Sequence, residues 1–354
     1  MRGLYIHVPF CAKKCPYCDF YSLPISEQKA GEYKNAVIRN LSKYNKERFD
    51  TVYFGGGTPA LIYDKIKEIL GAVNFTENAE ITVECNPESA DETVLRELKN
   101  AGANRLSFGV QSLDGTELSA LGRTHSAQNA IDVILLANSL GFENISADIM
   151  LGVPNQTLDS LEKTIEELCG LPITHVSAYL LKIEPNTVFG RKSKETADIM
   201  PDEDLQSELY LRAVELLESR GFTQYEISNF AKAGFESRHN LKYWRAEEYV
   251  GIGPSAHSYH NGKRFAVSRN LAKFLEDNFQ HEEITDESPD KDEEKILLGL
   301  RLCEGVELSK RLSERLKKRL SLIPEEYYRI TNNRLSLTPL GFLVSNEIIA
   351  TLLK

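Results

Sequence analysis

The first two thirds of the chain alternate short runs of β-branched and aromatic residues with longer segments that have the period of an amphipathic helix. This alternation is typical of repeated βα units around a parallel sheet. The predicted strands are Leu4–Val8, Thr51–Phe54, Glu80–Glu84, Arg105–Val110, Asn144–Met150 and His175–Tyr179, with Gln224–Ile227 as a candidate seventh. The predicted helices are Glu32–Tyr44, Asp64–Val73, Asp91–Ala101, Ala127–Leu140, Leu158–Leu168 and Glu203–Arg220. Six βα units predict an α/β fold with a partial (β/α)6 TIM-like barrel.

The pattern changes after residue 230. Residues 231–281 are irregular and rich in Gly, His and aromatic residues, and residues 282–294 are strongly acidic, which indicates a linker. In residues 295–354, two amphipathic segments and a turn at Asn332-Asn333 predict a small C-terminal helical domain with a β-hairpin, which we expect to be winged-helix-like. The chain is therefore divided into a barrel (1–230), the irregular segment, the linker and the C-terminal domain.

Composition limits the classes of partner. The chain has 354 residues, 42% of them hydrophobic, which is enough for a large core. The net charge of −10 argues against nucleic acid as the main partner, because phosphate binding depends on clustered Lys and Arg. Basic residues gather between Lys310 and Arg319, but leucines at helical spacing indicate the solvated face of an amphipathic helix. We see no signal-peptide pattern and no apolar run of the ~18 residues that cross a bilayer, and expect a cytoplasmic protein.

Three cysteines near the start, Cys11, Cys15 and Cys18, have the spacing C-x3-C-x2-C. Thiolates this close can bind three irons of a cubane 4Fe–4S cluster, whose fourth iron is then free to bind another molecule. A zinc site would need a fourth Cys or a His, and the nearby His7 lies in a predicted strand two residues before a proline. The scattered cysteines do not make a disulfide framework and are expected in the core: Cys85, Cys169 and Cys303.

Residues able to bind a ligand lie at the ends of the predicted strands, which meet at one mouth of such a barrel. They are Gly55-Gly56-Gly57-Thr58-Pro59, Glu84, Gln111, Asp148 and Tyr179. The glycine run lacks both phosphate-loop patterns, so we predict that its backbone amides approach a carboxylate or amino group of a small ligand. Glu84 suits a cationic group, Gln111 and Asp148 suit hydroxyls such as those of a ribose, and Arg123 suits a carboxylate. A structural role, such as a helix-start acid for Glu84, stays open for each.

The cysteine spacing, the Gly-Gly-Gly-Thr-Pro run and the later carboxylates resemble the radical S-adenosylmethionine (SAM) superfamily. The segment Tyr5-Ile-His-Val-Pro-Phe-Cys11 resembles the oxygen-independent coproporphyrinogen III oxidase family, and the likeness covers most of the chain. The resemblance implies a radical SAM type of barrel, a 4Fe–4S cluster on the three cysteines and an open iron that binds SAM. It also implies SAM contacts from Tyr5, Tyr17, Gly56, Gly57, Thr58, Glu84, Gln111, Arg123 and Asp148.

Two features differ from the true oxidases. Those enzymes carry a fourth cysteine two residues after the third, where this chain has Phe20. The run His239-Asn240-Leu-Lys-Tyr243-Trp244 matches the H-N-x-x-Y-W motif of the haem chaperone branch of the family, HemW. The resemblance therefore implies 4Fe–4S, SAM and haem as cofactors. It also implies haem-acceptor proteins of unknown identity as partners, with membrane-bound haem proteins among the candidates.

His239 is the first candidate for a haem ligand, since its imidazole can bind iron while Tyr243 and Trp244 cover the porphyrin face. The alternative is that His239 and Asn240 hydrogen-bond within a loop that closes the barrel mouth. His257 is a second candidate, although a buried loop histidine is the more common role. No catalytic residue is assigned, and we predict a chaperone rather than an enzyme. The alternatives are oxidative decarboxylation of porphyrinogen propionates and DNA binding through the C-terminal domain, which the negative charge opposes.

Overall fold

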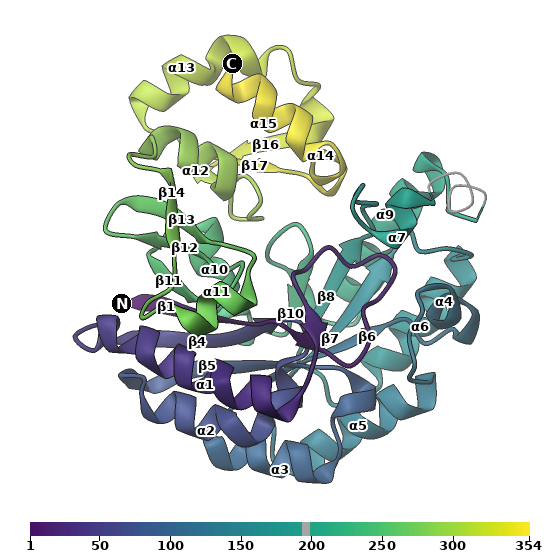
Figure 1. The fold of residues 1–354 in the computed structure, drawn as a ribbon. Coiled ribbons are helices and arrows are strands. Elements are labelled where there is room, and N and C mark those ends of the chain that lie inside the picture. The colour runs from purple at the N-terminus through teal and green to yellow at the C-terminus, as the bar shows by residue number, and fades with distance from the viewer. Residues whose placement is uncertain (193–198) are drawn as a thin grey trace.

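The computed structural model describes residues 1–192 and 199–354, and these contain a sheet of twelve strands (Figure 1). Seven neighbouring strands are parallel and form a partial barrel: β11 (Tyr249–Ile252), β1 (Arg2–Val8), β4 (Phe49–Gly56), β5 (Phe75–Cys85), β6 (Arg105–Gln111), β7 (Asn144–Leu151) and β8 (His175–Leu180). The six strands predicted from the sequence are confirmed. The seventh parallel strand, β11, comes from the segment that the sequence predicted to be irregular.

Helices cover the outer side of the parallel strands (Figure 1). They are α1 (Glu27–Leu41), α2 (Tyr63–Gly71), α3 (Glu92–Ala101), α5 (Ala127–Ser139), α6 (Leu158–Cys169) and α9 (Glu203–Ser219). The N-cap side chains of five of these helices, Ser26, Asp91, Ser126, Thr157 and Asp202, accept a backbone N–H of the first turn. The smaller elements of this half are α4 (Gly115–Ala120), α7 (Val188–Arg191), β2 (Phe10–Cys11), β3 (Leu23–Pro24) and three 3-10 helices, Ser42–Tyr44, Pro59–Ile62 and Pro87–Ser89. The predicted helices are therefore present, with ends that differ by a few residues.

Side chains alternate between the two faces of the barrel strands. On β6, Leu106 and Phe108 are fully buried in the core that the helices cover. Arg105 and Ser107 occupy the opposite face, where Ser107 hydrogen-bonds Asp148 of β7. The inward positions of the other strands are also polar: Thr51, Thr82, Glu84, Ser146, His175 and Ser177. The apolar core thus lies between sheet and helices, and the barrel interior is polar.

The candidate seventh strand differs from the prediction. Only β9 (Thr223–Gln224) forms there, and it pairs with β10 (Asn229–Ala231), which lies antiparallel to β8. Beyond β11 the sheet continues with antiparallel strands β12 (His257–His260), β13 (Lys263–Val267) and β14 (Glu282–Asp286). The helix α11 (Leu271–Glu276) lies between β13 and β14 in the chain. The segment predicted to be a linker therefore contains β14, an exposed edge strand whose acidic residues hinder pairing with another chain. The division into four domains stays a prediction.

Residues 291–354 form a unit that contacts the turn between β9 and β10, where the Ile227 N–H donates to the Arg301 carbonyl. Its elements are α12 (Lys291–Gly299), β15 (Val306–Glu307), α13 (Lys310–Leu320), the 3-10 helix Glu325–Tyr327, β16 (Tyr328–Thr331), β17 (Arg334–Leu337), α14 (Pro339–Leu343) and α15 (Ser345–Leu353). The predicted hairpin is confirmed, with Asn332 and Asn333 at positive φ in its turn. Leu302 forms a β-bridge with Glu226, which joins this unit to the barrel. None of the described helices is both long and apolar enough to cross a membrane.

Candidate functional site

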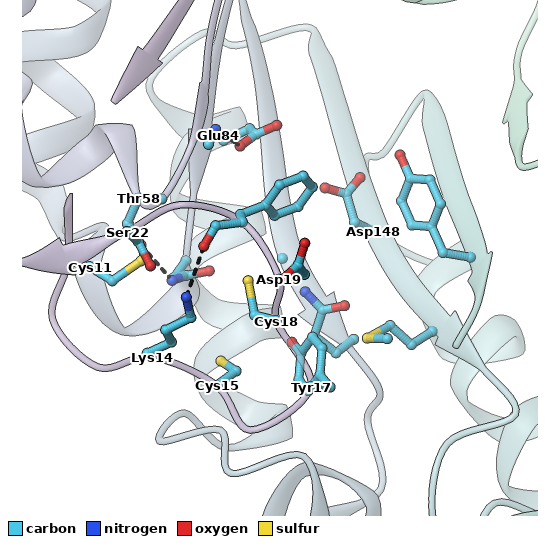
Figure 2. A pocket seen from close by; sticks show the side chains of 18 of the residues that line it. Cys11, Lys14, Cys15, Tyr17, Cys18, Asp19, Ser22, Thr58, Glu84 and Asp148 are labelled. Carbon is cyan, nitrogen blue, oxygen red and sulfur yellow. Dashed lines mark hydrogen bonds between the residues drawn. The ribbon is translucent and has the colours of Figure 1, made fainter. Parts of the chain in front are cut away.

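The cysteine-bearing loop lies at the C-terminal ends of the barrel strands. It is closed at its base by the pairing of β2 with β3, and Leu23 donates its backbone N–H to the Pro9 carbonyl at 2.8 Å. Cys11, Cys15 and Cys18 all line a cavity of about 530 Å³. Figure 2 shows their sulfur atoms on the inner side of the loop, below Glu84 and Asp148. The three cysteines, which are close along the chain, therefore line one cavity together.

The three thiols fit a 4Fe–4S cluster. Among the residues that the structure describes, no three His, Cys, Asp or Glu side chains are close enough together to hold one metal ion. Burial raises the pKa of the Cys18 thiol, and the neighbouring Cys15 and Cys11 raise it further. Three thiolates here would repel one another, and a positively charged iron centre relieves that repulsion.

Two donors contact the cysteine sulfurs from the barrel side. Arg123 Nη1 donates to Cys15 Sγ at 3.5 Å, and Thr58 Oγ1 donates to Cys11 Sγ at 3.7 Å. The other amino group of Arg123, Nη2, donates to Asn86 Oδ1 at 2.8 Å and to the Gly109 carbonyl at 3.0 Å. Arg123 is therefore fixed against the cysteine loop, where its charge stabilises thiolates.

The structure brings together eight of the nine residues for which the family resemblance implies SAM contacts. The cavity is lined by Tyr17, Gly56, Gly57, Thr58, Glu84, Gln111, Arg123 and Asp148. They come from different strands and from the loops that follow them, and they meet because the C-terminal ends of parallel strands share one edge of the sheet. Their contact with SAM stays a prediction.

Glu84 lies inside the cavity near the end of β5. Its Oε1 accepts the Tyr53 hydroxyl at 2.9 Å, and its Oε2 accepts the Gly56 N–H at 3.1 Å. Burial raises the pKa of this carboxyl to about 7, against the lowering effect of the Tyr53 hydrogen bond, and the charge of Asp148 adds to the rise. Glu84 is thus poised between its neutral and ionised forms, and a bound cation would favour the ionised form.

Asp148 lies beside it on β7 and is held by serine hydroxyls. Ser107 Oγ lies 3.0 Å from both carboxylate oxygens, and Ser146 Oγ donates to Oδ1 at 3.1 Å. Burial raises the pKa of Asp148 in spite of these hydrogen bonds. The two carboxylates give the cavity a negative wall opposite the cysteine loop, which suits a cationic ligand that also carries hydroxyl groups.

The backbone N–H groups of the glycine run are hydrogen-bonded within the protein, and the contact of this run with a small ligand stays a prediction. Gly57 donates its N–H to the Val8 carbonyl at 2.8 Å, and Thr58 donates its N–H to the Phe10 carbonyl at 2.6 Å. With the Gly56 N–H on Glu84, these amides are already used within the protein. A Cβ at Gly57 would lie 2.3 Å from the Phe10 carbonyl oxygen, so glycine is needed for the close approach of this loop to the cysteine loop.

Gln111 has a backbone conformation that is rare for a residue with a side chain. Its φ is +68°, and the pairing of β6 with β7 shifts register between Gly109 and Gln111. Non-glycine residues in this region are strained and gather at binding sites. The bulge turns the end of β6 toward the cavity, which places the Gln111 amide at its wall.

Tyr5 does not line the cavity. Its hydroxyl lies 3.1 Å from His7 Nδ1, and its ring stacks against Tyr53 with 6.2 Å between ring centres. Sequence analysis in turn missed Tyr53, Asn86 and Ser107, all of which line the cavity. The two-residue period of the strands could have indicated Tyr53 and Ser107, because each lies on the inward face of its strand together with a predicted site residue.

His239 lies at the other end of the barrel from the cysteines. It belongs to helix α10 (Arg238–Trp244), is 1% exposed, and contacts Thr51 of β4 and Glu80 of β5. Its Nδ1 lies 2.8 Å from Thr51 Oγ1, its Nε2 lies 2.8 Å from the Tyr243 hydroxyl, and its backbone N–H donates to Glu80 Oε1. Burial lowers its pKa to about 3. Both ring nitrogens are therefore occupied, and α10 closes the N-terminal end of the barrel, not the mouth that the alternative prediction named.

His257, the second candidate, is exposed on β12 and is not a buried loop histidine. Partial burial and the nearby Arg269 lower its pKa. It does not line the cavity. Neither histidine therefore lines the cavity, although His257 lies near Arg269, whose guanidinium donates to the Asp19 carbonyl of the cysteine loop.

Comparisons with known proteins agree with this geometry. The family model "Radical SAM superfamily" matches residues 5–168. A Bacillus subtilis protein named heme chaperone HemW is 36% identical, and the match covers 100% of this chain and 99% of that protein. The Escherichia coli protein of the same name is 34% identical over 86% of this chain and 83% of its own length. The solved structure of coproporphyrinogen III oxidase (HemN) from Escherichia coli shares the fold, with a TM-score of 0.83 over 99% of this chain and 89% of that one at 20% identity. The chain belongs to the HemW family of the radical SAM superfamily.

Proposed function

We propose that this protein is a haem chaperone, which binds haem and transfers it to acceptor proteins while holding a 4Fe–4S cluster and SAM. The observation that carries the proposal is the likeness to proteins named heme chaperone HemW along essentially the whole of both chains. The acceptors are haem proteins of unknown identity. Phe20 supports a task other than that of the oxidases, because it is 64% exposed at the cavity where those enzymes are expected to have a fourth cysteine.

Membership of the radical SAM superfamily implies a 4Fe–4S cluster and SAM. Cys11, Cys15 and Cys18 would hold the cluster, whose open iron then supplies a binding place for the amino and carboxylate groups of SAM. Glu84 and Asp148 would attract the cationic part of SAM and its ribose hydroxyls.

The raised pKa of Glu84 predicts how SAM binding depends on pH. SAM carries a sulfonium and an amino group, so the ionised carboxylate should bind it more tightly than the neutral acid. We expect SAM affinity to rise by up to about tenfold per pH unit as the pH increases toward 7, and to level off above that value. Equilibrium dialysis of the cluster-loaded protein between pH 6 and 8 measures this effect.

The matched control for this prediction is a second buried carboxyl with a raised pKa. Glu117 hydrogen-bonds Ser112 and Gln156, and it does not line the cavity. Glu84→Gln should flatten the pH profile, whereas Glu117→Gln should keep the profile of the unaltered protein. A flat profile in the unaltered protein, or an unchanged one in Glu84→Gln, would contradict the role of Glu84.

One experiment separates a chaperone from an oxidase. The cluster is reconstituted without oxygen, and haem binding is followed by the visible absorbance of haem during titration. In parallel, coproporphyrinogen III is incubated with the protein, SAM and a reductant, and the products are separated by chromatography. We expect stoichiometric haem binding without decarboxylated product. Formation of protoporphyrinogen would support the oxidase and overturn the proposal.

Transfer is tested with a haem-free b-type cytochrome as the acceptor. Haem-loaded protein is mixed with the cytochrome, and the acceptor spectrum is followed with time. We expect faster loading than from haem-loaded serum albumin at the same haem concentration. Equal rates would show that haem only dissociates and rebinds, which is binding without a chaperone function.

A further inference from the structure

A continuous series of hydrogen bonds crosses the barrel interior from the cavity to the start of α10. We infer that this series couples SAM binding at the cavity to the position of α10, so that SAM and haem change each other's affinity. The haem half of this inference rests on the proposed function, whereas the link between SAM and α10 can be tested without haem.

The series has five members, and each contact is within hydrogen-bonding distance. Ser146 Oγ donates to Asp148 Oδ1 at 3.1 Å and lies 2.8 Å from His175 Nδ1. His175 Nε2 lies 2.8 Å from the Tyr225 hydroxyl. The Ser237 backbone N–H donates to that same hydroxyl oxygen at 3.2 Å. Asp148 lines the cavity, and Ser237 is the N-cap of α10, so the series joins both ends of the barrel.

All donors in the series point toward Asp148. Burial lowers the pKa of His175 well below its usual value, so the ring is neutral and carries one N–H. Because the Ser146 hydroxyl donates its hydrogen bond to Asp148, the Ser146 oxygen accepts the N–H of His175 Nδ1. Nε2 then accepts the Tyr225 O–H, and the Tyr225 oxygen accepts the Ser237 N–H. Bonds that run in one direction polarise one another, so a change at one end alters the strength of the others.

Solvent has little access to the series. Ser146, His175 and Ser237 are each 0% exposed, and Asp148 and Tyr225 are partly buried. Water therefore cannot readily replace a member that moves. A ribose hydroxyl that donates to Asp148 competes with Ser146 for the carboxylate, and the adjustment passes to His175 and Tyr225 rather than to solvent.

The first turn of α10 is fixed by side chains of the barrel interior. Glu80 Oε2 and Oε1 accept the backbone N–H groups of Arg238 and His239, each at 3.1 Å, and Tyr225 accepts that of Ser237. The Ser237 hydroxyl accepts the Asn240 N–H at 3.4 Å. The helix has only seven residues, so its position depends on these contacts more than on its own hydrogen bonds.

A second set of contacts connects the other carboxylate of the cavity to the same helix. Tyr53 donates its hydroxyl to Glu84 at 2.9 Å, and its ring stacks on His239 with 5.2 Å between ring centres. His239 in turn lies 2.8 Å from the Tyr243 hydroxyl. Both carboxylates that would contact SAM are therefore linked to α10 indirectly, by contacts through one or more buried side chains.

Trp244 reports on this helix directly. It is the only tryptophan of the chain and the last residue of α10. Its ring lies 5.8 Å from the guanidinium carbon of Arg301 in the C-terminal unit. Addition of SAM to the cluster-loaded protein should change the Trp244 emission, with a midpoint at the SAM dissociation constant measured by dialysis. The adenine group of SAM absorbs ultraviolet light, so each titration is compared with a titration by adenosine, which corrects for absorption by the added ligand.

Two variants interrupt the series at different places. Tyr225→Phe removes the hydroxyl that joins His175 to Ser237, and Ser146→Ala removes the oxygen between Asp148 and His175. The matched control is Tyr210→Phe, because the Tyr210 hydroxyl is also buried and donates to the Ile227 carbonyl at 2.9 Å, outside the series. We expect the SAM-dependent change in emission to be lost in the first two variants and kept in the control. The cluster absorbance and SAM binding by dialysis show that each variant is folded.

The same four proteins are titrated with haem, with and without saturating SAM. Coupling predicts that SAM changes haem affinity by at least about fivefold in the unaltered protein and in Tyr210→Phe, and by less than twofold in the other two. Haem binding that does not respond to SAM overturns the coupling and leaves the proposed function in place. Absence of haem binding overturns the proposed function, and the Trp244 titration then decides the inference alone. An emission change that persists in Tyr225→Phe contradicts it.

Discussion

The Cys15→Ala variant should lose its iron–sulfur cluster completely. Only two thiols, Cys11 and Cys18, would remain on the loop, which is too few to hold the cubane against loss of iron. The substitution also removes the sulfur that accepts from Arg123 Nη1. Since Cys15 is only half-buried, we expect the free energy of unfolding of the apoprotein to change by less than about 1 kcal/mol. Iron and sulfide content and visible absorbance after oxygen-free reconstitution measure the effect.

Cys85→Ala is the matched control for this prediction. Cys85 lines the same cavity and is a free thiol, but it lies at the end of β5, where its Sγ contacts the Val83 carbonyl at 3.8 Å. Burial raises the pKa of this thiol, which disfavours the thiolate. The control should keep the full iron content. A cluster that survives in Cys15→Ala, or is lost in Cys85→Ala, would contradict the assignment of the ligands.

The parallel part of the fold could be predicted from the sequence because its order is local. Each βα unit is complete within about 40 residues, and its strand and helix carry different hydrophobic periods. The strands after β8 could not be found in the same way. β9 and β10 have two and three residues, and β11 to β14 form because they pair with one another and with β1. Such short segments have no period of their own and depend on partners elsewhere in the chain.

The site residues that could be predicted are likewise those whose positions depend on local order. Glu84, Gln111 and Asp148 were found because they lie close to the ends of adjacent parallel strands, which must meet. Tyr5 does not line the cavity, because its ring packs against Tyr53 and His239 in the barrel interior. The place of α10 could not be predicted, because a helix about 60 residues beyond β8 can pack against either end of the barrel.

This placement of α10 alters the meaning of its motif. The His239 ring and Lys242 make contacts that fix α10 to the barrel, with His239 Nδ1 2.8 Å from Thr51 Oγ1 and Lys242 Nζ 3.0 Å from Asp50 Oδ1. Ligation of haem by His239 stays a prediction, and it would require that the hydrogen bonds to Thr51 and Tyr243 break. The polar barrel interior thus gives the motif a structural role that its residue types alone do not reveal.

We expect His239→Ala to lower the free energy of unfolding by about 2–4 kcal/mol. The substitution leaves a cavity among Tyr5, Tyr53 and Tyr243, and it leaves Thr51 without its hydrogen-bond partner. Denaturant unfolding of the apoprotein measures the loss. His257→Ala is the matched control, because the exposed His257 should contribute less than about 0.5 kcal/mol.

The pH dependence of stability distinguishes this structural role from a general loss of packing. The pKa of His239 is about 3 in the folded protein and near 6.5 when the chain is unfolded. Below pH 6.5 the unfolded chain therefore binds a proton that the folded protein does not, and this histidine lowers stability by about 1.4 kcal/mol per pH unit as the pH falls toward 3. In His239→Ala the free energy of unfolding should depend less steeply on pH in that range, by about 1.4 kcal/mol per pH unit, which corresponds to one proton. In His257→Ala this pH dependence should be nearly unchanged. A His239→Ala variant that unfolds like the unaltered protein but no longer binds haem would instead identify His239 as a haem ligand.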